Sequence, residues 1–195
     1  KLDKKPEAIQ AYEAVLERRP TDAVAIAALE ELYQEAGRER ELARLLEMRA
    51  EATQEPVARG VLFARVATLR GNRGDTEGAL AAYSASFSAD PSNREVFTAF
   101  ERITYKAERW IVAMQLYEQA IRHVEGGASR AYRLGDLYLR RGNVQLNFLG
   151  KPEEAIASYQ KVIEVDSQPG LAVKSLEDLC KARGDYAPLI EAYDR

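Results

Sequence analysis

The side chains that most often catalyse reactions or bind metal ions are scarce in this sequence. Its 195 residues include a single histidine, His123, and a single cysteine, Cys180. A zinc site of the usual type needs about four cysteine or histidine ligands, and a disulfide needs two cysteines. Any catalytic triad would depend on His123 alone. We therefore expect no metal site and no disulfide within the chain.

The other reactive side chains also argue against catalysis. The 31 aspartate and glutamate residues show no spacing that isolates a pair in apolar surroundings, which acid–base catalysis needs. The segment 71–74 (Gly-Asn-Arg-Gly) joins two predicted helices, whereas a phosphate-binding loop joins a strand to a helix. His123 lies near a predicted helix end, where a cation is stabilising, and Cys180 occupies a predicted core position. We therefore predict a protein that is not an enzyme, with no catalytic residues and no cofactor.

Composition and charge narrow the class of protein further. The chain is 46% hydrophobic and 30% charged, with a net charge of -3. These balanced charges do not indicate a surface that follows a phosphate backbone, so we expect no nucleic acid partner. No apolar run approaches the roughly 20 residues of a membrane-spanning helix. The scarcity of cysteine favours a cytoplasmic location, and both ends of the sequence suggest a piece of a longer protein.

The elements that carry these residues repeat along the chain. Five segments hold, one of them loosely, a pattern in which a small residue comes four positions before an aromatic one, so that both lie on one helical stripe. The equivalent positions 8, 42, 79, 113 and 155 are separated by 34, 37, 34 and 42 residues. This period predicts stacked helix pairs. Their first helices are expected at 22–36, 57–71, 93–106, 129–141 and 170–183.

Two stretches resemble a known repeat family. Residues 134–138 (Leu-Gly-Asp-Leu-Tyr), followed by 151–159 (Lys-Pro-Glu-Glu-Ala-Ile-Ala-Ser-Tyr), and the run from Gly74 to Pro91 carry the small, aromatic and proline positions of the tetratricopeptide repeat. The chain therefore resembles this family. The resemblance implies an all-α fold in which antiparallel helix pairs stack into a right-handed superhelical α-solenoid.

The repeats divide the chain into predicted segments of a single array, residues 1–195. A lone second helix occupies 1–20, three repeats span 21–56, 57–91 and 92–127, a fourth spans 128–168, and a truncated fifth spans 169–195. The fourth repeat is the longest, and we assign its eight additional residues to an insertion at 143–150. Either its first helix continues and packs the apolar residues Val144, Leu146, Phe148 and Leu149, or Leu146, Phe148 and Leu149 form an exposed contact for a partner or another copy.

Three glutamates depart from the family pattern. The family places a small residue on the first helix where the second helix crosses it, and Ala67 and Gly135 fit this requirement. Glu30, Glu101 and Glu177 stand at that position in the odd repeats, separated by 71 and 76 residues. We predict that these side chains reach outward or that the two helices splay. A pair between Glu30 and Arg49 is one way to satisfy the first of them.

The resemblance implies that the first helices line a concave groove that holds an extended or helical segment of a partner. The predicted groove contacts are Arg65, Arg102, Tyr105, Lys106, Tyr132, Arg133, Arg140 and Lys174. Arginine and tyrosine often dominate binding energy, and arginine pairs well with carboxylates, so the sharper prediction is an acidic peptide. The alternative is a solvated helix face, in which Asp136 pairs with Arg133 and Arg140 on its own helix.

The family's carboxylate clamp of lysine and asparagine is absent. Ala27, Glu31 and Arg65 stand at the relevant positions, so binding to the acidic tails of heat-shock chaperones is not expected. The function favoured by the sequence is a non-enzymatic scaffold for protein–protein interaction. The alternatives are a half-a-tetratricopeptide module of RNA processing and a self-assembly segment that associates end to end through its truncated fifth repeat.

Overall fold

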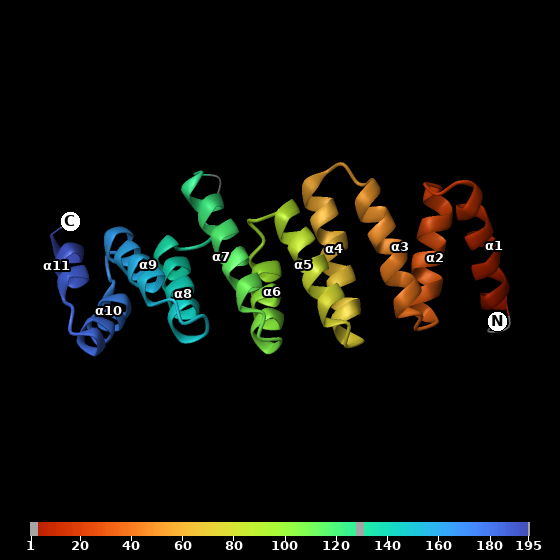
Figure 1. Cartoon of the computed structure of the whole chain (residues 1–195). Helices are drawn as coiled ribbons and strands as arrows, with labels where there is room; N and C mark the ends of the chain where they lie inside the picture. The colour runs from red at the N-terminus through yellow and green to blue at the C-terminus, as the bar shows by residue number, and fades with distance from the viewer. Residues whose placement is uncertain (1–3, 128–130, 195) are drawn as a thin grey trace. The chain divides into compact units, whose positions relative to one another are not determined.

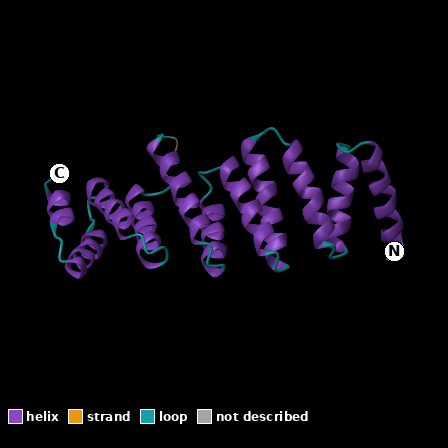
Figure 2. Ribbon diagram, viewed as in Figure 1, coloured by secondary structure: helices purple, strands orange, loops and turns teal. Residues whose placement is uncertain are grey.

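The computed structural model describes residues 4–127 and 131–194, and in these ranges the elements longer than a turn are all α-helices (Figure 2). This confirms the predicted all-α repeat of paired helices. Labelled as in Figure 1, the helices are α1 (Lys5–Arg18), α2 (Ala23–Glu35), α3 (Glu39–Ala52), α4 (Pro56–Asn72), α5 (Thr76–Ala89), α6 (Arg94–Lys106), α7 (Trp110–Glu125), α8 (Leu134–Asn147), α9 (Pro152–Val165), α10 (Gly170–Arg183) and α11 (Ala187–Tyr193).

The helices form two compact units, Lys1–Asp90 with α1 to α5 and Pro91–Arg195 with α6 to α11. The residues at the boundary stop one helix and start the next. Pro91 follows the end of α5 and cannot continue a helix, because it lacks a backbone N–H. The side chain of Asn93 then accepts hydrogen bonds from the backbone N–H groups of Glu95 and Val96, both at 3.1 Å, and so caps α6.

Within each unit, neighbouring helices cover one another's apolar faces. In the first unit α4 packs against α3 and α5, and in the second unit α8 packs against α7 and α9. Helices joined by short loops run in opposite directions (Figure 1). Leu46 and Val66 are fully enclosed in the first unit, and Tyr117 and Tyr159 in the second. Because the inner helices of each unit are covered by the one before and the one after them, the core of each unit continues from helix to helix.

Most of the predicted first helices lie where the sequence placed them. The helices α2, α4, α6 and α10 begin and end within one residue of the predicted ranges. The first helix of the fourth repeat was predicted at 129–141 but begins at Leu134 and runs to Asn147. Its predicted start, Ser129, lies outside the described residues. The helix extends past 141 because Val144 and Gln145, on its last turns, are buried.

Residues 143–150 are not set apart as an insertion. Residues 143–147 belong to α8, where the Ser158 hydroxyl donates to Gln145 Oε1 at 2.6 Å and the Gln145 amide donates to Glu154 Oε2 at 3.2 Å. Four residues, 148–151, join α8 to α9. Of the two alternatives, the one in which the first helix of the fourth repeat continues therefore holds for residues 143–147.

Two glycines of α8 lie close against α9 or its end, Gly142 and the predicted Gly135. A Cβ atom at Gly142 would lie 2.6 Å from the ring of Tyr159 and 3.2 Å from Ser158 Cβ. A Cβ atom at Gly135 would instead meet Asp166, with 2.6 Å to its carboxylate. Asp166 directly follows the last residue of α9, so Gly135 meets the end of that helix, whereas Gly142, which the sequence did not single out, meets its middle.

Candidate partner-binding site

The second unit contains a hollow of about 350 Å³ between α6 and α8, the first helices of two successive pairs. We call it the α6–α8 hollow. Its walls are mostly polar, with the rings of Phe97 and Tyr132 among them, and are formed by Arg94, Phe97, Thr98, Glu101, Ala131, Tyr132, Arg133, Asp136, Leu137 and Arg140. Three of the predicted groove contacts, Tyr132, Arg133 and Arg140, therefore lie together around one concave surface.

Glu101 organises the wall of this hollow. The Tyr117 hydroxyl donates to Glu101 Oε1 at 2.6 Å and also contacts the Tyr105 hydroxyl at 3.1 Å. Arg140 Nη1 donates to Glu101 Oε2 at 2.5 Å. Burial raises the pKa of Tyr117 above its usual range, and its hydrogen bonds to Glu101 and Tyr105 act in the same direction. The hydroxyl therefore stays protonated and can keep donating to the carboxylate.

Glu30 forms comparable ion pairs in the first unit. Its Oε2 accepts from Arg49 Nη1 at 2.8 Å, which confirms the predicted Glu30–Arg49 pair, and its Oε1 is bound by Arg65. The Glu30 and Glu101 side chains are 17% and 19% exposed, so they are satisfied by partners and do not reach freely into solvent. Glu177 is exposed on α10 and has no ion pair within the described residues.

The predicted groove cations fall into two groups. Arg65, Arg133 and Arg140 are partly exposed at the surface but form ion pairs with carboxylates of the same chain, and the partner of Arg133 is Asp166, at 2.9 Å. The predicted alternative, pairing of Arg133 and Arg140 with Asp136 on their own helix, is therefore wrong, because both arginines pair with carboxylates of other helices or their ends. The predicted cations Arg102, Lys106 and Lys174 are exposed and have no ion pair in the described part of the chain.

Sequence reasoning missed Arg94. It lies at the first position of α6, is exposed, lines the α6–α8 hollow, and its guanidinium has no partner within the described ranges. Arg94, Thr98 and Arg102 follow at four-residue intervals, so they form one stripe along α6. This interval was the signal in the sequence that could have identified it. Lys174 on α10 and Arg65 on α4 lie outside the α6–α8 hollow.

Aromatic rings hold the hollow in shape. The rings of Phe97 and Tyr132 pack at 4.9 Å between centroids, and the Arg140 guanidinium lies 5.9 Å from the centre of the Phe97 ring. Tyr105 meets the ring of Trp110 edge-on at 5.1 Å. Tyr132 is therefore a packed wall residue of the α6–α8 hollow, whereas Tyr105 lines a neighbouring hollow together with Arg102.

Leu146, Phe148 and Leu149, the alternative contact for a partner or another copy, are only partly exposed. Phe148 is 47% exposed and stacks on Trp110, with 3.8 Å between ring centroids and an interplanar angle of 11°. Leu146 and Leu149 are half-buried. Of these three residues, Phe148 is the one that presents a large apolar surface.

The described residues offer little reactive chemistry. Within the described ranges, no three His, Cys, Asp or Glu side chains gather into a group that could hold a metal ion. Cys180 is buried, and burial raises the pKa of its thiol. None of the helices in the described ranges is both long enough and apolar enough to cross a bilayer.

Residues 128–169 match the model of the tetratricopeptide repeat family. No curated protein matches the chain. Among solved structures, BtubC (BKLC) from P. vanneervenii is similar at 15% identity and a TM-score of 0.47, over 98% of this chain and 86% of that chain. PilF of Pseudomonas aeruginosa is similar at 19% identity and a TM-score of 0.45, over 98% and 76%. YrrB, described as a tetratricopeptide repeat protein with an unusual peptide-binding site, is similar at 18% identity and a TM-score of 0.43, over 90% and 86%.

Proposed function

Because residues 128–169 match the tetratricopeptide repeat family, we propose that this chain is a non-enzymatic module of protein–protein interaction that holds an acidic segment of a partner against α6 and α8. Such a module needs a preformed concave surface and a few side chains that are free to bind. The α6–α8 hollow supplies the surface, and the α6 stripe supplies the free side chains.

The observation that carries the proposal is the contrast between paired and unpaired arginines. Arg140 is held by Glu101, and Arg133 by Asp166, so their charges are already compensated. Arg94 and Arg102 line neighbouring hollows of about 350, 360 and 390 Å³ along α6, and their guanidinium groups have no partner in the described part of the chain. Guanidinium groups form strong paired hydrogen bonds with carboxylates. A partner with carboxylates therefore satisfies groups that the fold leaves free.

Helix geometry sets the spacing of those carboxylates. Arg94 and Arg102 are eight residues apart on α6, which is about 12 Å at a rise of about 1.5 Å per residue. Residues four apart in an extended peptide span about 13 Å. An extended partner with acidic residues at positions i and i+4 therefore matches the stripe, with Lys106 available one turn beyond Arg102.

The test is the selection of peptides that bind the wild-type chain from a random display library, followed by measurement of their affinity for charge-reversal variants. We expect acidic peptides whose affinity falls about tenfold or more for Arg102→Glu. The matched control is Arg18→Glu, which changes net charge equally in the first unit at an exposed position of α1. Peptides that bind Arg102→Glu and the wild type equally, or a selection without acidic peptides, would contradict the proposal.

A second candidate function is self-association through α10 and α11. Leu171, Ile190 and Tyr193 on these helices are 70%, 58% and 62% exposed, which is unusual for large apolar side chains on neighbouring helices. A second copy of the chain would cover them. Light scattering should show association that rises with concentration and that Ile190→Lys suppresses, and a strict monomer at high concentration would exclude it.

A further inference from the structure

Besides the α6–α8 hollow of the second unit, the structure has a hollow in the first unit that contains none of the predicted groove residues. It has a volume of about 380 Å³ and is lined by Arg40, Ala43, Arg44, Arg70, Arg73 and Asp75. These residues come from α3, from the end of α4, and from the turn that leads into α5. We call it the arginine hollow. None of the predicted partner contacts lines it, and no lysine does.

Arg70 is the fixed member of this set. Its Nη2 donates to Glu47 Oε2 at 2.6 Å, its Nε lies 4.0 Å from Asp75 Oδ2, and its Nη1 donates to the backbone oxygen of Gly78 at 3.4 Å. The side chain is 22% exposed, so it is held in place at the base of the hollow.

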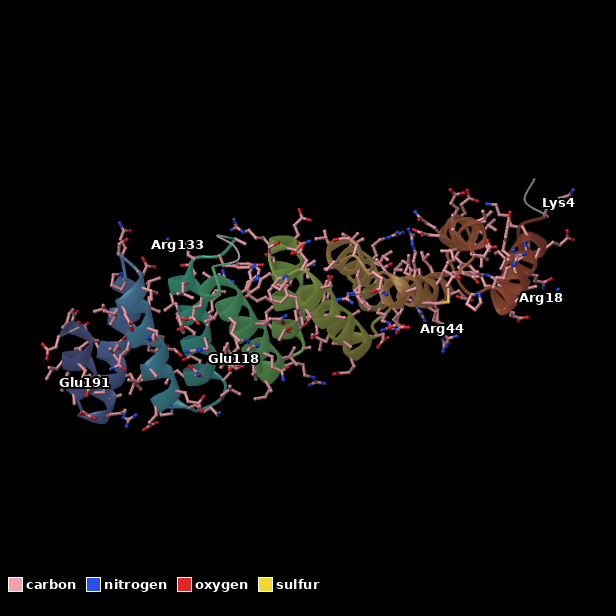
Figure 3. All side chains as sticks on the ribbon, turned by 90° about the horizontal axis from the view of Figure 1, so that it is seen from above. Lys4, Arg18, Arg44, Glu118, Arg133 and Glu191 are labelled. Atoms are coloured by element: carbon pink, nitrogen blue, oxygen red, sulfur yellow. The ribbon has the colours of Figure 1, made fainter. Side chains whose placement is uncertain are left out.

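The other three arginines have no such compensation. Arg40, Arg44 and Arg73 are exposed, and none forms an ion pair within the described residues. Figure 3 shows Arg44 pointing away from its helix at the surface. Arg40 and Arg44 lie one turn apart on α3, a spacing at which like charges repel. The four arginines of the lining have two paired carboxylates, those of Glu47 and Asp75, both beside Arg70, so two positive charges are left in excess.

We propose that the arginine hollow binds a phosphoryl group carried by a serine, threonine or tyrosine side chain of a partner protein. A phosphoryl group brings close to two negative charges and three acceptor oxygens to one point, which matches the excess charge and the several donors of this hollow. A single carboxylate brings one charge and two oxygens, and would leave half of the excess uncompensated. Arginine is also the side chain whose planar fork suits phosphate oxygens.

The exposure of the three unpaired arginines favours a group presented on a chain. Their guanidinium groups stand at the surface, so a phosphorylated side chain can reach them while its backbone stays outside the hollow. This inference does not depend on the α6–α8 hollow, because the two sites share no residue and lie in different units. Failure at one site therefore leaves the other proposal standing.

The experiment measures fluorescence anisotropy of a labelled, otherwise neutral five-residue phosphoserine peptide with the whole chain at low ionic strength. We expect saturable binding that weakens about tenfold or more in the double variant Arg40→Ala/Arg44→Ala. The control double variant Arg18→Ala/Arg122→Ala removes two exposed arginines elsewhere and should bind like the wild type. Circular dichroism melts verify that both variants are folded, which their exposed positions favour.

Two further peptides separate the phosphoryl group from other anions. The same peptide with serine in place of phosphoserine should not bind, and the peptide with two adjacent glutamates should bind at least about tenfold more weakly than the phosphoserine peptide. Equal binding of the diglutamate peptide would overturn the assignment to a phosphoryl group. Unchanged binding of the phosphoserine peptide to Arg40→Ala/Arg44→Ala, or no binding to the wild type, would overturn the site itself.

Discussion

Glu101 on α6 and Arg140 on α8 form an ion pair, with 2.5 Å between Oε2 and Nη1 across 39 residues of sequence. The same relationship joins Glu30 on α2 to Arg65 on α4, across 35 residues. In both cases a glutamate at a position where the family has a small residue binds an arginine on the first helix of the next pair. The glutamates therefore link successive helix pairs. They also neutralise Arg65 and Arg140, two cations that we had predicted to bind a partner.

The ion pair of Glu101 should support the stability of the second unit. Glu101→Ala removes the carboxylate acceptor of the enclosed Tyr117 hydroxyl and the ion-pair partner of Arg140, so the free energy of unfolding should fall by about 1–3 kcal/mol. Urea unfolding followed by circular dichroism measures it. Glu118→Ala, at an exposed position of α7, is the control and should change stability by less than about 0.5 kcal/mol. Equal effects of the two variants would show that Glu101 has no structural role.

Gly142 should not tolerate a methyl group. In Gly142→Ala the new Cβ would lie 2.6 Å from the Tyr159 ring, and relieving that clash should cost about 1–3 kcal/mol of stability. Gly170→Ala at the start of α10 adds a Cβ atom that meets nothing within 4 Å. It should therefore be neutral or slightly stabilising, because alanine restricts the unfolded chain. Thermal melts of both variants compare them, and a Gly142→Ala protein as stable as the wild type would place the helix crossing elsewhere.

Phe148 should report on Trp110, the single tryptophan of the chain. Phe148→Ala removes the ring stacked on Trp110 at 3.8 Å, so we expect the tryptophan emission to shift to longer wavelength as water reaches the indole. The loss of the stacked pair should lower stability by about 0.5–1.5 kcal/mol. Leu171→Ala, at a position 70% exposed on α10, is the control. An emission spectrum that Phe148→Ala leaves unchanged is the result that counts against the stacked geometry.

Tyr138 should make stability depend on alkaline pH. Burial, and after it the hydrogen bond from its hydroxyl to Glu125, raises the pKa of Tyr138 to about 12. The unfolded chain has a tyrosine pKa of about 10. Because the folded value is the higher one, this contribution to stability is complete below about pH 10 and is lost as the pH rises toward 12.

Thermal melts between pH 8 and pH 12 measure this loss. Tyr33 and Tyr117 have raised pKa values with the same sign, so Tyr138→Phe should reduce the alkaline loss without abolishing it. Tyr193→Phe is the control, since Tyr193 is 62% exposed. Identical pH dependence in the Tyr138→Phe variant and the wild type would show that the Tyr138 hydroxyl is not held in the fold as described.

The paired helices could be predicted from the sequence because their signals are local. The four-residue interval from Ala79 to Tyr83 places both on one helical stripe, and both are buried in α5. Pro91 and Asn93 mark the end of α5 and the start of α6 through the chemistry of their own backbone and side chain. Such signals involve neighbours within about one helical turn, so they need no knowledge of the rest of the fold.

Tertiary structure alone decided which charges are free and where helices cross. Whether Arg140 is available to a partner depends on Glu101, which is 39 residues away, and no spacing rule on one helix reveals that pair. The same limit applied to Gly135 and Gly142, since both lie on α8 and only the path of α9 shows which of them meets Tyr159. Helix formation is fixed by contacts along a turn, whereas a pairing between helices is fixed by how their side chains pack in three dimensions.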